Sequence, residues 1–168
     1  MLVVAQFSRH SAALDWGRQR LERSFGPILL ASEVFPFDYT AYYAKAMGTD
    51  LRKQLLAFSD LISGHQLPAI KCQTIHMEQE LAASGQFPEA RPLNLDPGYL
   101  GLRKFVLATT KDQIHRVYLH EGIYAEVTLV YHEGKLRPAP WTYADYQQPD
   151  VLEFLHCARE QFLARRIM

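Results

Sequence analysis

Charged and imidazole side chains gather between residues 96 and 126 of a chain in which 48% of the residues are hydrophobic. This stretch offers carboxylates, an imidazole, an ammonium and a guanidinium. Such groups run acid–base chemistry or hold ligands that bear a phosphate or another anion. We interpret four residues as candidate acid–base groups, namely Asp96, Asp112, His115 and Glu126. The candidates for ligand binding are Asp38, Tyr99, Lys111, Arg116, Tyr118 and Tyr124.

Several of these residues also have a purely structural explanation. Asp96 precedes Pro97-Gly98, and an aspartate in this place commonly caps its own turn. The parity of its strand turns His115 inward, as expected for a buried or edge histidine. The remaining charges are what a polar loop and a hairpin would contain. The sequence therefore leaves two explanations open, a site or turn capping with surface ion pairs.

The hairpin around Gly122 gives the most specific geometric expectation. If His120-Glu121-Gly122 is a three-residue loop, Tyr118 lies opposite Tyr124 and Arg116 lies opposite Glu126, which is a stabilising cross-strand pair. Alternation then assigns one face to Arg116, Tyr118, Tyr124, Glu126 and Thr128. The core face carries Val117, Leu119, Ile123, Ala125, Val127 and Leu129. The polar face is either solvent-exposed surface or a floor on which tyrosines stack and Arg116 holds an anion.

The elements that must position these residues follow from the apolar pattern. A strand over Leu2–Phe7, a helix from Ser11 ended by Gly26-Pro27, and a strand over Ile28–Phe35 predict a β-α-β opening. The segment 51–62 fits a helix or a strand, and we favour a strand. A helix from Pro68 to about Ser84 follows, and another begins at Pro149. The later strands are expected over Lys104–Thr109, Ile114–Leu119, Ile123–Tyr131 and Leu136–Arg137.

We therefore expect one α+β domain over residues 1–168. Its mainly antiparallel sheet includes a C-terminal hairpin and is packed by about three helices. Asp38 is expected to cap a short helix that runs to Met47. The segment Asn94–Tyr99 is expected to form a type II turn, because Pro97 fixes φ and Gly98 permits a positive φ.

The overall charge excludes some classes of protein. Eighteen basic and eighteen acidic residues give a net charge of zero, which argues against a nucleic-acid or membrane-surface binder. The zero is a local cancellation, because residues 91–116 carry an excess of basic residues and residues 117–160 an excess of acidic ones. A local anion site in the basic segment is therefore compatible with the composition. No apolar run is long enough for a membrane span and no secretion signal is evident, so we expect a cytoplasmic protein.

Known catalytic and cofactor motifs do not appear in the sequence. It has no phosphate-binding loop, no dinucleotide-binding glycine pattern and no nucleophile elbow. The seven histidines lack the spacing of a zinc site, and Cys72 and Cys157 each stand alone. The sequence therefore identifies no cofactor and predicts no metal site.

Five strings carry a family resemblance: residues 32–43, N-L-D-P-G-Y-L at 94–100, and residues 108–119, 122–129 and 140–146. Over essentially its whole length the chain resembles an uncharacterised family of small bacterial and archaeal proteins, domain of unknown function 4416. The resemblance implies no activity, cofactor or catalytic residue. It adds interest to the matched polar residues Asp38, Asp96, Lys111, Asp112, His115, Arg116 and Glu126.

Two classes of function fit these observations. The first is a small-ligand-binding protein or enzyme whose anionic or phosphate-bearing ligand is held by Lys111 and Arg116. The second is a non-enzymatic interaction module that uses aromatic loops 35–43 and 141–146 as a surface for a partner or a second copy. A closed pocket with charged side chains favours the first, whereas a flat aromatic patch favours the second. RNA binding by stacked tyrosines is disfavoured by the net charge.

Overall fold

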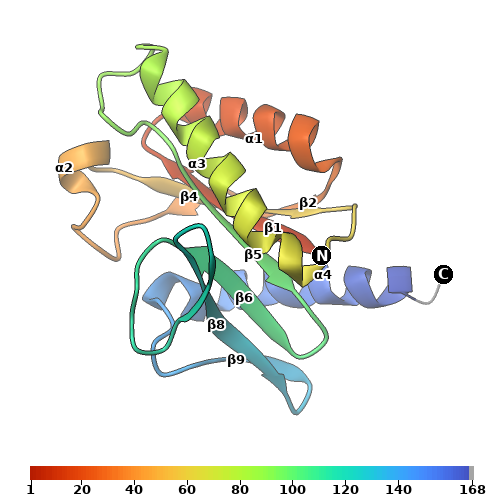
Figure 1. The fold of residues 1–168 in the computed structure, drawn as a ribbon. Helices are drawn as coiled ribbons and strands as arrows, with labels where there is room; N and C mark the ends of the chain where they lie inside the picture. The colour runs from red at the N-terminus through yellow and green to blue at the C-terminus, as the bar shows by residue number, and fades with distance from the viewer. Residues whose placement is uncertain (167–168) are drawn as a thin grey trace.

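A single antiparallel sheet forms the centre of the molecule in the computed structural model, which describes residues 1–166 (Figure 1). Seven strands follow the order β2-β4-β1-β5-β6-β8-β7, with β3 paired to β4 and β9 paired to β8. The strands are β1 (Leu2–Ser8), β2 (Ile28–Ala31), β3 (Phe35–Pro36), β4 (Arg52–Phe58), β5 (Asn94–Leu100), β6 (Lys104–Thr109), β7 (Val117–His120), β8 (Ile123–His132) and β9 (Lys135–Pro138).

Helices cover both faces of this sheet. The helices α1 (Ser11–Phe25) and α3 (Leu67–Ala83) lie on one face, and α4 (Pro149–Arg166) lies on the other (Figure 1). Alternation along β1 separates the two cores, because Leu2 and Val4 pack with α1 and α3 while Val3 and Ala5 pack with α4. The predicted α+β domain with a mainly antiparallel sheet is confirmed. A fourth helix, α2 (Ala44–Met47), has only four residues.

The opening strand, helix and strand are confirmed, but the two strands are not neighbours. Strand β4 lies between β1 and β2 and is antiparallel to both. Helix α3 then returns the chain to β5, on the other side of β1. This is the β-α-β-β-α-β order of a split β-α-β unit. Strands β6 to β9 extend the sheet beyond β5, and residues from this extension meet residues from the split unit in the cavity described below.

The predicted strand Ile28–Phe35 and the helix capped by Asp38 are corrected by the structure. Strand β2 ends at Ala31, because Ser32 turns its hydroxyl to the N–H of Leu55, and the chain rejoins the sheet only at β3. Helix α2 is preceded by Tyr43 instead of Asp38. The buried ring of Phe37 packs in a small core of its own, which holds the preceding chain in an irregular path.

The predicted turn at Asn94–Tyr99 is wrong, since this segment is strand β5. It pairs with β1 from Leu2 opposite Tyr99 to Phe7 opposite Asn94. Gly98 is needed because the two strands lie close together, and not because of a positive φ. A Cβ atom there would lie 2.6 Å from the carbonyl oxygen of Val106, so glycine allows β5 and β6 to approach closely.

Strands β5 and β6 then part. They pair only from Gly98 opposite Leu107 to Leu100 opposite Phe105. Beyond Gly98, β5 continues along β1 to Asn94, whereas β6 continues along β8 to Thr109. The sheet is therefore open between Asp96 on one strand and Ala108 on the other.

The hairpin register is confirmed at Tyr118 opposite Tyr124, but its loop has two residues. Glu121 and Gly122 both have positive φ, as in a type I′ turn, and the pairing shifts by one residue beyond Tyr118. Strand β7 starts at Val117. The Val117 side chain was predicted to lie in the core, but it is 67% exposed because β7 is a sheet edge.

None of the helices in the described residues is long and apolar enough to cross a membrane.

Candidate functional site

A cavity of about 350 Å³ lies where β5 and β6 part. Its floor is made by residues of five neighbouring strands: Phe7, Lys53, Asp96, Leu107 and Glu126. Three segments far apart in the sequence form its walls, and they are residues 37–43, 109–116 and 143–146. This volume is within the range of small-molecule sites in proteins.

The cavity wall is rich in cations. Five basic side chains line it, namely Lys53, Lys71, Arg91, Lys111 and Arg116, against the carboxylates Asp96, Glu126 and Asp145. Each carboxylate is paired with one of these cations, at 3.1 Å for Lys71–Asp96, 2.8 Å for Arg116–Glu126 and 2.5 Å for Lys53–Asp145. Arg91 and Lys111 therefore have no carboxylate partner within the cavity wall.

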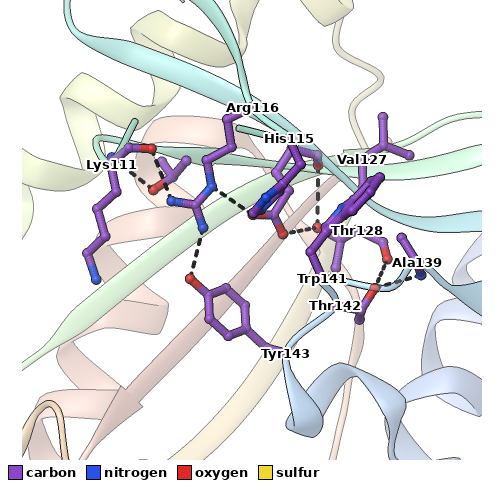
Figure 2. Close-up of polar contacts among 11 residues, drawn as sticks. Lys111, His115, Arg116, Val127, Thr128, Ala139, Trp141, Thr142 and Tyr143 are labelled. Atoms are coloured by element: carbon purple, nitrogen blue, oxygen red, sulfur yellow. Dashed lines mark hydrogen bonds and ion pairs between the residues drawn. The ribbon is translucent and has the colours of Figure 1, made fainter. Parts of the chain in front are cut away.

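Arg116 is held by hydrogen bonds from three of its nitrogens (Figure 2). Nε donates to Glu126, Nη1 donates to the carbonyl oxygen of Lys111 and Nη2 donates to the hydroxyl of Tyr143. Burial alone would lower the pKa of Arg116, but its bonds to Glu126 and Tyr143 raise it above the usual value. The guanidinium thus stays charged and ties the 110–116 loop to the 143–146 wall.

Glu126 also contacts His115 and Thr128. The imidazole Nε2 of His115 lies 3.0 Å from the carboxylate, and the ring stacks on Trp141 with 5.0 Å between centroids. The Trp141 indole in turn donates to the carbonyl of Val127 (Figure 2). With an arginine, a histidine and a threonine around it, the Glu126 carboxylate organises this wall.

Lys71 reaches Asp96 from helix α3, which packs on the opposite face of the sheet. Its ammonium donates to the carbonyl of Leu95 and to the Asp96 carboxylate, and the separation of β5 and β6 lets it contribute to the cavity wall. Burial would raise the pKa of Asp96, but the charges of Lys71, Lys53 and Arg91 outweigh it and hold that pKa below its usual value. Asp96 is therefore an ionised carboxylate, with its side chain 30% exposed to the cavity.

Lys53 lies deep in the floor. Its ammonium is bound to Asp145 and is surrounded by the rings of Tyr146, Phe37 and Phe7, at 4.5, 4.9 and 5.6 Å from their centroids. Such contacts stabilise a cation that has lost most of its water.

The mouth of the cavity is lined by partly exposed tyrosines and Lys111. The Lys111 ammonium lies 3.9 Å from the centre of the Tyr42 ring, which joins the 110–116 loop to the 37–43 segment. Next to the mouth, a shallower hollow is lined by Gln113, His115 and Trp141. The exposed Tyr42 and Tyr143 border both the cavity and the hollow.

The comparisons with known proteins identify a family but no function. A family model described as Domain of unknown function (DUF4416) matches residues 1–162. The chain belongs to this family. No curated protein and no solved structure matches the chain.

The structure brings four of the predicted site residues of this DUF4416 chain into the cavity, and they are Asp96, Lys111, Arg116 and Glu126. His115 lies behind Glu126 and lines only the outer hollow. The other predicted residues do not line the cavity: Asp38, Tyr99, Asp112, Tyr118 and Tyr124. Tyr99 falls on the opposite face of β5, with the core under α3, because its parity differs from that of Asp96.

Four charged lining residues were not among the predicted site residues: Lys53, Lys71, Arg91 and Asp145. Lys53 shares a strand face with the apolar Leu55 and Ala57, Lys71 follows Ile70 in α3, and both lysines are buried. A lysine at a core position could have been recognised as a site residue from the sequence, because a buried charge needs a partner.

No group of three or more His, Cys, Asp or Glu residues in positions 1–166 is arranged to hold a metal ion.

Proposed function

We propose that this protein binds a small organic anion, with a carboxylate or phosphate group, in the cavity between β5 and β6. The observation that carries the proposal is the charge pattern of the wall, in which five cations face three carboxylates. Arg91 pairs with Glu78 outside the wall, and Lys111 has no carboxylate partner among the described residues. A cavity with more cations than carboxylates in its wall, and with aromatic side chains beside them, favours such a ligand.

Arg91 and Lys111 are the proposed anion-binding groups. Nη2 of Arg91 is engaged by Glu78 and Asn94, whereas Nε and Nη1 donate to no group in the described residues. The Lys111 ammonium contacts only the face of Tyr42 in this part of the chain. Both cations can therefore bind a ligand without breaking an ion pair of the cavity wall.

If the protein is an enzyme, Asp96 is the carboxylate that faces the ligand. Glu126 is committed to Arg116, and Asp112 and His115 stand outside the cavity wall, so we assign these three no direct contact with the reacting atoms. Asp96 would accept a hydrogen bond or a proton.

We propose a cytoplasmic location, supported by the two unpaired cysteines, Cys72 and Cys157.

The interaction-module alternative rests on four partly exposed aromatic residues near the mouth, Tyr39, Tyr42, Trp141 and Tyr143. Three of them also line the cavity, and the fourth, Trp141, stacks on His115. The positions of these four aromatic residues therefore also fit a small-ligand site. A surface for a second copy would give a concentration-dependent mass by light scattering, which the variant Tyr42→Ser/Trp141→Ser would abolish.

The proposal is tested by searching for an anion that binds. Native mass spectrometry of gently purified protein would detect a co-purifying anion, and thermal shift with sugar phosphates, nucleotides and organic acids would extend the search. We expect at least one anion to raise the melting temperature of the wild type. It should bind at least about 10-fold more weakly to Arg91→Gln/Lys111→Gln, which corresponds to about 1.4 kcal/mol.

The matched control is Lys135→Gln, which removes an exposed lysine at the start of β9. It should bind the anion as the wild type does. The proposal is wrong if no anion in the panel binds the wild type, or if the double variant and the control bind it equally well.

A further inference from the structure

The hydroxyl group of Tyr146 is buried without a hydrogen-bond partner among the described residues. The residue is 2% exposed and belongs to the cavity wall. Its ring packs against Phe105 on one side and beneath the Lys53 ammonium on another, so the side chain is firmly placed. A buried hydroxyl that makes no hydrogen bond destabilises the folded chain, and a phenylalanine would avoid this cost.

The charges around this hydroxyl define what it can bind. Burial, together with the carboxylates of Asp145, Asp96 and Glu126, raises the pKa of Tyr146 well above its usual value. The hydroxyl is therefore protonated and is available as a donor. Asp96 is close enough to influence it electrostatically, yet no hydrogen bond joins the two groups.

Asp96 has unused acceptor capacity. One of its oxygens accepts from Lys71 and the other from Asn94, whereas an ionised carboxylate can accept about four hydrogen bonds. Tyr146 and Asp96 both line the cavity, so a donor and an acceptor belong to the same wall. A ligand hydroxyl is the group that satisfies both, because it accepts one hydrogen bond and donates another.

We propose that the ligand is a hydroxylated organic anion, such as a sugar phosphate or a hydroxy acid, one hydroxyl of which bridges Tyr146 and Asp96. This inference rests on the proposed function, since the anionic group of the same ligand meets Arg91 and Lys111. Tyr146 is then the specificity-determining donor of the cavity. It selects a hydroxylated anion over an alkyl anion of the same charge, because the alkyl anion would leave Tyr146 unsatisfied.

The experiment compares matched pairs of anions by titration calorimetry with the wild type and with Tyr146→Phe. The pairs are glucose 6-phosphate with hexyl phosphate, glycerol 3-phosphate with propyl phosphate, and gluconate with hexanoate. In at least one pair the hydroxylated member should bind the wild type about 10-fold more tightly. Tyr146→Phe should abolish that preference and leave the affinity for the alkyl anion unchanged.

Stability and a control variant separate this role from a structural one. Tyr146→Phe removes an unsatisfied buried hydroxyl, so its melting temperature without ligand should equal or exceed that of the wild type. The control Tyr131→Phe changes a tyrosine of β8 that does not line the cavity, and it should keep the preference.

The remaining outcomes distinguish a wrong role for Tyr146 from a wrong anion site. If hydroxylated and alkyl anions bind the wild type equally, or if the preference survives in Tyr146→Phe, the inference about Tyr146 is wrong while the anion site stands. If no anion of either kind binds, the proposed function and this inference both fail.

Discussion

The guanidinium of Arg116 donates to the carboxylate of Glu126 at 2.8 Å, with both side chains at least 97% buried. One residue precedes the edge strand β7 and the other lies within β8, so the pair fastens the 110–116 loop to the sheet. Through Tyr143 and the Lys111 carbonyl, the same arginine joins two walls of the cavity. The shape of the cavity therefore depends on this ion pair.

Replacing Glu126 by glutamine should destabilise the protein by about 3 kcal/mol, because the charge of Arg116 would stay buried without compensation. Urea unfolding at neutral pH measures the change. The matched control is Glu133→Gln, which breaks the exposed pair with Arg137 and should cost less than about 1 kcal/mol. Equal effects of the two substitutions would show that the buried pair has no special weight.

Gly98→Ala should destabilise the protein by about 1 to 3 kcal/mol through overpacking. The new methyl group would lie 2.6 Å from the Val106 carbonyl oxygen and 2.9 Å from the Phe105 ring, so β5 and β6 would have to shift. The comparison is Gly101→Ala, since the nearest atom to a Cβ there is 3.7 Å away. Thermal unfolding of the two variants checks the prediction, and a harmless Gly98→Ala would contradict the close strand approach.

Lys53 and Asp145 should behave as one unit in a double-mutant cycle. Lys53→Met or Asp145→Leu alone should each cost about 3 to 5 kcal/mol, because each leaves a buried charge unpaired. The double variant should cost much less than the sum, since the aromatic surroundings of Lys53 accommodate apolar side chains. Additive costs in denaturant unfolding would mean that the two residues are energetically independent.

Asp96 should make stability depend on pH in the acid range. Its pKa is held below the usual 3.8 in the folded protein, so the unfolded chain binds the proton more readily. The stabilisation is complete above the unfolded pKa of about 3.8 and is lost as the pH falls through the folded pKa. The stability difference between wild type and Asp96→Asn should therefore be constant from pH 5 to 7 and shrink below about pH 4. Urea unfolding across this range measures it, and a pH-independent difference would refute the assignment.

Several features of the fold follow from local sequence patterns. The apolar pattern predicted a helix from Ser11, which is α1, and Gly26-Pro27 predicted where it ends. The paired Tyr118 and Tyr124 followed from alternation on either side of a glycine-containing turn. Such features involve residues that are near one another in the chain, so pattern and turn chemistry suffice to predict them. The family was also recognised from the sequence, and the family model that matches residues 1–162 confirms it.

By itself the sequence determined the α+β class, the β-α-β opening, the long helices and the contact between Arg116 and Glu126. Only the tertiary structure decided that Asn94–Leu100 is a strand, because the close approach of Val106 is a contact that the local Pro-Gly signal does not reveal. It also decided that Arg116 and Glu126 line a cavity. That cavity depends on pairs such as Lys53 and Asp145, which are 92 residues apart, and such contacts arise only when the sheet brings distant segments together.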